Sequence, residues 1–269
     1  MATLPPELER EIFEYALISS KIEREEYSRV KSTLSLVCQR VHQWTQIFFY
    51  RSFGAKAGTD VTKFLRLVAR MPPGFSDRVK ELRFGHRVPH PEIIEMVSAC
   101  NKAEQLACFV EPATKPDLPL LIRQLPLTRL WIEHSHFLSV ASLETPPKLL
   151  PALTHLYLVF WDRRPIKDIT VLTRNILRLP SLTHLALSFT PSNPALVKTI
   201  CAALPDLHII VVTLGDNTPN TSQAEYSFDP RIAPVYEAVF KENDISDCNI
   251  LWADAARFIA QRRAADRSG

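Results

Sequence analysis

Glycine and the motifs of catalysis are scarce in this chain. Only six glycines occur among 269 residues. They form neither a phosphate-binding loop nor a dinucleotide-binding fingerprint, and the chain contains no H-E-x-x-H and no G-x-S-x-G motif. We therefore expect a protein that is not an enzyme, with no catalytic residues and no cofactor.

Cysteine is also sparse, and its spacing excludes two further kinds of site. The five cysteines are odd in number and scattered, with no C-x-x-C pair. Neither a disulfide framework nor a cysteine zinc site fits this pattern. His86 and His90 precede Cys100 closely, but Cys100 falls on the apolar face of a predicted helix, so we expect a buried and unreactive thiol.

Long apolar runs are absent. No segment is apolar over the length of a membrane-spanning helix, and the N-terminus opens on a charged, proline-containing segment rather than a signal sequence. These absences predict an intracellular protein, cytoplasmic or nuclear, with no membrane partner.

The formal net charge is only +3 and both signs are interspersed, so we expect no nucleic-acid partner. The arginines between Arg257 and Arg267 are interpreted as the solvated end of a helix.

The first fifty residues carry the signals of helices. Leu4-Pro5-Pro6-Glu7-Leu8 places prolines where a helix tolerates their missing N–H, and acidic residues follow in the first turn. Leu8, Ile12 and Phe13 then share one side of the predicted helix. A second helical pattern runs from Val30 to Phe48. So small a bundle buries little surface, and part of its apolar stripe is expected to meet another protein or the next domain.

This N-terminal pattern resembles the F-box motif. The segment from Leu4 to Phe13, followed by Leu34-Ser35-Leu36-Val37-Cys38, by Trp44 and by Phe48-Phe49-Tyr50, is similar to the F-box version common in mushroom-forming fungi. The resemblance implies docking onto the Skp-type adaptor of a cullin-RING ubiquitin ligase, and through it onto the cullin scaffold. The residues that it assigns to the adaptor surface are Leu4, Pro5, Leu8, Ile12, Phe13, Leu36, Val37 and Trp44.

A second interpretation makes the same residues the core of a helical cap on the following domain. The segment 18–33 is longer and more charged than the turn of the commonest F-boxes. Burial of the first helix against Val61, Phe64 or Leu65 would indicate a cap, whereas an exposed stripe favours docking.

The rest of the chain repeats a short apolar pattern six times. The central residues of the six units are Leu82, Leu106, Leu130, Leu156, Leu185 and Ile210. They are 24, 24, 26, 29 and 25 residues apart, which is the period of leucine-rich repeats. Three of the units share the sequence Leu-Thr-x-Leu, beginning at Leu127, Leu153 and Leu182.

Helical stretches such as Pro91–Cys100, Lys167–Leu179 and Asn193–Leu204 separate these strand-like cores. Each unit is therefore predicted to be strand, turn and helix, and stacked units bury a shared row of leucines. The array resembles an irregular leucine-rich solenoid, although the asparagine expected after each central leucine is missing. The predicted fold class is α/β: a short N-terminal helical F-box module followed by a leucine-rich-repeat solenoid, with parallel strands on one face and helices on the other.

The predicted division of the chain has four parts. A helical module covers 1–53, a linking helix and loop 54–78, the repeat domain 79–214, and a loop with a helical cap 215–269. Within the last part, Arg231–Glu242 is expected to be helical, Asn249–Trp252 an edge strand and Ala253–Arg263 a second helix. Such a cap would give the last repeat a polar outer face.

The residues that flank the central leucines should point to the other, open face of the sheet, because side chains alternate along a strand. Trp131 and Tyr157 fall there on adjacent strands with charged neighbours, which is typical of binding hot spots. Alternatively, the N-terminal module or the C-terminal cap covers both aromatic residues. The predicted substrate contacts are Phe109, Arg129, Trp131, Glu133, His155, Tyr157 and His184.

His155 and His184 should stack about 5 Å apart on adjacent strands. No third ligand occupies the same position on other strands, so we expect no metal site.

Two classes of function remain. The first is a substrate receptor of an SCF-type ubiquitin ligase, which holds an unknown protein substrate while other subunits carry out the transfer. The second is a non-catalytic leucine-rich-repeat scaffold or adaptor outside ubiquitin transfer.

Overall fold

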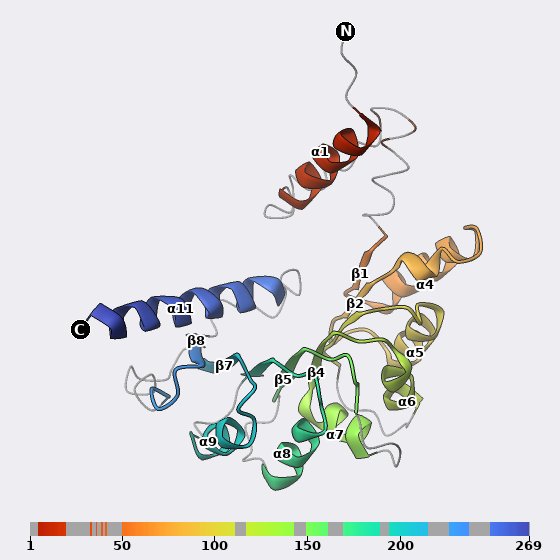
Figure 1. Cartoon of the computed structure of the whole chain (residues 1–269). Helices are drawn as coiled ribbons and strands as arrows, with labels where there is room; N and C mark the ends of the chain where they lie inside the picture. The colour runs from red at the N-terminus through yellow and green to blue at the C-terminus, as the bar shows by residue number, and fades with distance from the viewer. Residues whose placement is uncertain are drawn as a thin grey trace.

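The computed structural model is an α/β protein built on one eight-stranded sheet (Figure 1). The structure describes residues 5–19, 50–110, 117–142, 149–160, 169–188, 194–214, 226–236 and 248–268, with the single residues 33, 36, 39 and 41. The strands lie in chain order and every pair is parallel. They are β1 (Ser52–Ala55), β2 (Glu81–Phe84), β3 (Gln105–Cys108), β4 (Arg129–Glu133), β5 (His155–Val159), β6 (His184–Ser188), β7 (Ile209–Leu214) and β8 (Ile232–Tyr236).

Among the described residues, a row of helices covers one side of this sheet and one helix covers the other (Figure 1). The row consists of α4 (Gly58–Val68), α5 (His90–Ala99), α6 (Asp117–Gln124), α7 (His134–Ser142), α8 (Ile169–Leu177) and α9 (Pro194–Ala203). Helix α11 (Cys248–Ser268) lies on the opposite side, and α1 (Pro6–Ser19) stands apart from the sheet. Among the helices described, none has both the length and the apolar character needed to cross a bilayer.

The main core lies between the sheet and the row of helices. The predicted central residues occupy equivalent positions on neighbouring strands, for example Leu130, Leu156 and Leu185, and all six are 0 % exposed. Each buried leucine contributes roughly 1.5 to 3 kcal/mol to stability. The predicted α/β class with parallel strands and a helical face is thus confirmed, and the arrangement is solenoid-like.

A ladder of threonine side chains connects the starts of successive strands. The hydroxyl groups of Thr128, Thr154 and Thr183 donate to the carbonyl oxygens of Glu104, Thr128 and Thr154 at 3.1, 3.0 and 3.2 Å. Each of these carbonyl groups also accepts two backbone N–H groups from the next strand. The shared Leu-Thr-x-Leu sequence therefore has a physical reason: its threonine, two residues before the central leucine, connects neighbouring strands by side-chain hydrogen bonds.

Replacing Thr154 by valine tests this ladder. The change keeps the shape of the side chain but removes the hydroxyl donor to Thr128 and the partner of the His155 ring, so we expect the free energy of unfolding to fall by about 1 to 2 kcal/mol in urea titrations. Thr199→Val is the control, because its exposed hydroxyl only bonds back within α9. Equal stability of the two variants would contradict the role of the ladder.

The sheet extends further than the repeat pattern predicted, at both ends. Strand β1 pairs with β2 although its residues lack the leucine signature. The predicted helix Arg231–Glu242 is wrong over Ile232–Tyr236, which forms β8, and the predicted strand Asn249–Trp252 is wrong because it lies within α11. Pro234 is tolerated in β8 because an edge strand pairs on one side only.

Candidate functional site

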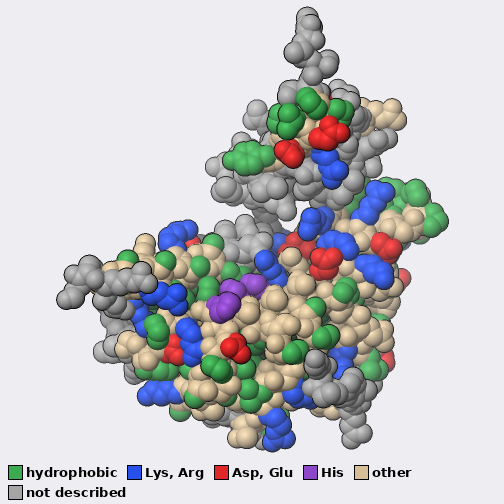
Figure 2. Space-filling view, in the orientation of Figure 1, with side chains coloured by type: hydrophobic (Ala, Val, Ile, Leu, Met, Phe, Trp, Pro, Cys, Tyr) green, Lys and Arg blue, Asp and Glu red, His purple; other side chains and the backbone are tan. Residues whose placement is uncertain are grey.

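Helix α1 presents an exposed apolar stripe. Pro6 occupies its first turn together with Glu7 and Glu9, in agreement with the predicted helix start. Leu8, Ile12 and Tyr15 are 46 %, 55 % and 73 % exposed and follow one another at the spacing of one helix face. Figure 2 shows the hydrophobic side chains on α1, above the body of the molecule. Sequence reasoning had missed Tyr15, although its spacing from Leu8 and Ile12 was visible.

The other residues assigned to the adaptor surface are only partly described. Pro5 is exposed, Phe13 is partly exposed, and Leu36 is 85 % exposed. Leu4, Val37 and Trp44 lie outside the described residues. Val61 and Phe64 belong to the main core, where the Phe64 ring lies 4.3 Å from that of Phe53. The stripe of α1 is therefore not buried on α4.

Helix α11 packs on the face of the sheet opposite the main core, against β7 and β8, and its Trp252 reaches β5 and β6. Leu251, Trp252, Ala255 and Ile259 of this helix are buried and form a second hydrophobic cluster with the sheet. We call the sheet side of that cluster the covered face; its residues are Ala107, Trp131, Tyr157, Val159, Ala186, Ile209, Val211 and Ala233.

Trp131 and Tyr157 are thus interior residues, 2 % and 7 % exposed. The prediction that they lie on an open surface is wrong for this structure, and the alternative, a cover from the C-terminal part of the chain, describes it. The alanines beside them on neighbouring strands leave room for the large rings. A sequence signal was present, because the strand Ile209–Leu214 is apolar at consecutive positions, as expected of a strand buried on both faces.

Glu133 is buried as well, and it serves as a helix cap. Its carboxylate accepts hydrogen bonds from the backbone N–H of Ser135 at 2.8 Å and of His136 at 3.2 Å, and from the Ser135 hydroxyl, at the start of α7. Burial raises the pKa of this carboxyl, but the hydrogen bonds and the adjacent His134 outweigh burial and hold the pKa below its usual value. The expected substrate contact at Glu133 is therefore replaced by a structural one.

His155 and His184, the histidine pair, stack with their ring centres 4.0 Å apart and an interplanar angle of 12°. The Trp252 ring of α11 lies across the pair, 5.2 Å from His155 and 5.5 Å from His184, at 76° and 86°. Figure 2 shows histidine side chains grouped on this face. No group of three His, Cys, Asp or Glu side chains within the described ranges is placed to hold a metal ion.

The threonine ladder fixes which ring nitrogen of each histidine carries the proton. The Thr154 and Thr183 hydroxyl groups give their only proton to carbonyl oxygens, so each must accept a hydrogen bond from the Nδ1–H of the adjacent histidine, at 2.8 Å in both cases. An Nδ1–H is present in both the neutral and the protonated imidazole, so the charge of the two rings depends on their pKa values. Burial, followed by the nearby positive charges, lowers the pKa of His155 to about 3 and that of His184 to about 4.

The predicted contacts that keep part of their surface are Phe109, Arg129 and the histidine pair. Phe109 directly follows β3, Arg129 begins β4, and the histidine pair begins β5 and β6. Phe109 also packs against the second hydrophobic cluster. The structure therefore brings the seven predicted contacts onto one face, but it divides them between an accessible margin and a covered centre.

The thiols of Cys100, Cys108 and Cys201 are buried. Burial, as the main cause, raises the pKa of each to about 12, so they are protonated and unreactive at neutral pH.

Comparisons of the chain with protein families, with curated proteins and with solved structures find no match. The features of the structure that bear on function are the exposed stripe of α1 and the face on which α11 packs.

Proposed function

We propose that this chain is a substrate-receptor subunit of an SCF-type cullin-RING ubiquitin ligase. Its N-terminal F-box module docks onto a Skp-type adaptor, which connects it to the cullin, and its leucine-rich-repeat domain holds a protein substrate. The observation that carries the proposal is the exposed stripe of Leu8, Ile12 and Tyr15 on a helix that stands apart from the sheet. Such a stripe is unfavourable in water and typical of a surface that a partner covers.

In this role the chain performs no bond chemistry. It raises the local concentration of substrate beside the enzymes that transfer ubiquitin. The alternative, a scaffold outside ubiquitin transfer with a purely structural cap, requires contacts between the stripe and α4. The exposure of Leu8 and Ile12 disfavours it.

Binding of the full chain to a purified Skp-type adaptor tests the proposal. We expect a Leu8→Ala/Ile12→Ala variant to bind at least about 100-fold more weakly than the parent in calorimetry, because hot-spot side chains contribute roughly 2 kcal/mol each. Both residues are exposed, so the variant should retain its stability.

A matched control is available on the opposite side of the molecule. Leu120 and Leu177 are 46 % and 47 % exposed on α6 and α8, so Leu120→Ala/Leu177→Ala removes similar apolar surface without touching α1. This control should bind like the parent. Failure of the folded parent to bind any adaptor, or equal weakening in the control, would refute the receptor role.

A further inference from the structure

The contact between α11 and the covered face resembles the binding of a helix in a groove. The buried residues of α11 lie on one side, at positions 251, 252, 255 and 259, whereas Ala253, Ala256 and Ala260 on the other sides are exposed. The spacing is that of an amphipathic helix with one aromatic anchor, Trp252, which is how helical peptides bind to preformed grooves. The occupant in this structure is a segment of the same chain.

This contact is incomplete in its hydrogen bonding. The indole N–H groups of Trp131 on the sheet and Trp252 on the helix are buried without an acceptor among the described residues, and the buried Ser188 hydroxyl also has no partner there. Buried donors without acceptors weaken a contact, and they favour any ligand that supplies an acceptor. The Trp252 donor leaves with α11, so a competing helix needs an acceptor only for the donors that stay on the sheet, Trp131 and Ser188.

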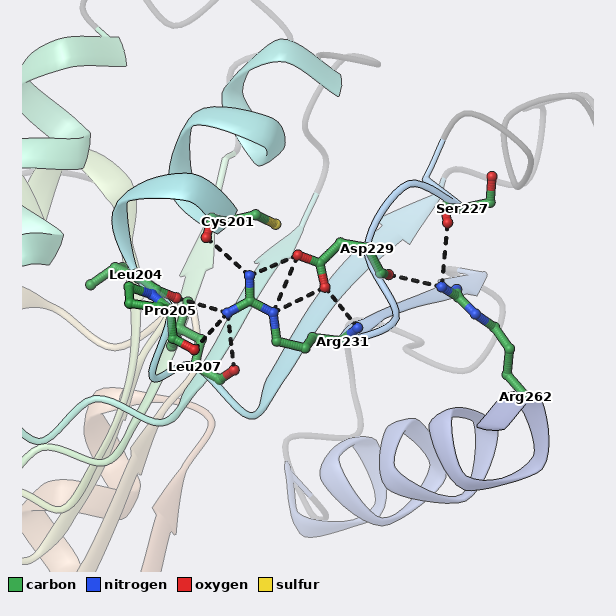
Figure 3. Close-up of polar contacts among 8 residues, drawn as sticks. All are labelled: Cys201, Leu204, Pro205, Leu207, Ser227, Asp229, Arg231 and Arg262. Carbon is green, nitrogen blue, oxygen red and sulfur yellow. Dashed lines mark hydrogen bonds and ion pairs between the residues drawn. The ribbon is translucent and has the colours of Figure 1, made fainter. Parts of the chain in front are cut away.

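Helix α11 is attached in a way that permits exchange. Residues 237–247, eleven in number, connect it to β8. Near its other end, Arg262 donates to the backbone carbonyl oxygens of Asp229 at 2.9 Å and Ser227 at 3.4 Å, just before β8 (Figure 3). These bonds lie away from the histidine pair, where Trp252 is seated. The first half of α11, which carries the buried residues Leu251, Trp252 and Ala255, can thus leave while Arg262 still holds the other end.

We propose that the covered face is a helix-binding surface, that α11 is its resident occupant, and that a protein partner with an amphipathic helix bearing an aromatic anchor and a hydrogen-bond acceptor competes with α11 for it. Only the identity of this partner as a ligase substrate rests on the proposed function. The competition itself involves no adaptor, so a failure of adaptor binding leaves it untouched.

A labelled peptide of residues 248–268, with Cys248→Ser to prevent oxidation, serves as the probe. In the full chain, Ala255→Glu places a carboxylate in the apolar contact and should release α11, whereas Ala256→Glu makes the same change on the exposed side. We expect the peptide to bind the Ala255→Glu chain at least about tenfold more tightly than the parent or the Ala256→Glu chain, because tethered α11 competes at high effective concentration. Fluorescence anisotropy measures the difference, and a peptide carrying Ala255→Glu should not bind.

Equal binding of the peptide to the parent and to a folded Ala255→Glu chain would overturn the proposal. Hydrogen exchange in the unmodified chain provides a second test that does not depend on any variant. The backbone N–H groups of α11 should exchange at least about 100-fold faster than those of β4 to β7, because local release is easier than global unfolding. Equal protection of the helix and the strands would mean that α11 opens only when the whole fold does, and would also overturn the proposal.

Discussion

Replacing Arg231 by methionine is expected to lower the free energy of unfolding by about 3 kcal/mol. The guanidinium group donates to the backbone carbonyl oxygens of Cys201, Leu204 and Pro205, each at 2.9 Å, and to that of Leu207 at 3.3 Å (Figure 3). It also pairs with both carboxylate oxygens of Asp229. One side chain therefore satisfies the carbonyl groups at the end of α9 and joins them to the start of β8.

Methionine keeps much of the apolar volume but removes every side-chain donor. The Asp229 carboxylate then keeps the backbone N–H of residue 231, and the carbonyl groups at the end of α9 lose the guanidinium group. Arg231→Lys retains the charge but not the planar fork, so it should lose about half as much stability. Arg257→Met is the control, because the ion pair between Arg257 and Asp254 is exposed and should contribute less than about 0.5 kcal/mol. Urea denaturation measures the free energy of unfolding of all three variants. If Arg231→Met were as stable as the parent, water would replace the guanidinium group as the hydrogen-bond donor to these carbonyl groups.

The repeated core was predictable from the sequence because the repeat itself encodes it. Each central leucine occupies the same place on its strand, so a period of about 25 residues locates six of the strands directly. The Leu-Thr-x-Leu units additionally mark where the threonine ladder runs. Local pattern and tertiary role agree here, since every unit meets a nearly identical neighbour.

The ends of the sheet were not predictable in the same way. Within the described part of the chain, Ser52–Ala55 and Ile232–Tyr236 stand at the two edges of the sheet, and neither carries the leucine signature. Their strand conformation depends on pairing with β2 and β7 rather than on intrinsic preference. The start of α11 was mistaken for a strand for a related reason, because a short apolar run fits both structures.

The prediction of an open substrate surface is wrong at the centre of that surface because a segment far along the chain covers it. Aromatic residues with charged neighbours look alike in sequence whether a partner or another part of the same chain packs on them. Tyr157 could be placed correctly on its strand, but no local pattern indicates that Trp252, far along the chain, seats against the adjacent histidine pair. For α1, by contrast, the exposed stripe lies on the side that the helical spacing had indicated.

Mild acid is expected to loosen α11 through the histidine pair. Both histidines have pKa values far below their usual 6.5, about 3 for His155 and about 4 for His184, so the folded state disfavours their protonation. The released or unfolded state binds more protons below pH 6.5, and stability is therefore full above that pH and is lost as the pH falls toward 4. The groups that face the pair are Trp252 from α11, Arg129 from β4 and His208 beside β7.

The size of the effect follows from the same pKa shifts. At pH 5 each histidine would oppose folding by up to about 2 kcal/mol, which we reduce to about 1 kcal/mol because both rings are partly exposed and solvent screens their charge. The pair together should then lower the free energy of unfolding by about 2 kcal/mol between pH 7 and pH 5. Faster hydrogen exchange in α11 should accompany the loss, since Trp252 packs directly on the pair.

A variant with His155→Phe and His184→Phe separates this effect from other titrations. Phenylalanine keeps a stacked aromatic pair beneath Trp252 but cannot be protonated, so its stability should change little between pH 7 and pH 5. His86→Phe, at an exposed position, should retain the pH dependence of the parent. The pKa of Glu133 is lowered, so this carboxyl changes stability only at pH values below the usual pKa of a carboxyl group. It therefore does not contribute between pH 7 and pH 5. If the double variant lost as much stability as the parent on acidification, the histidine pair would not be the group that responds to pH.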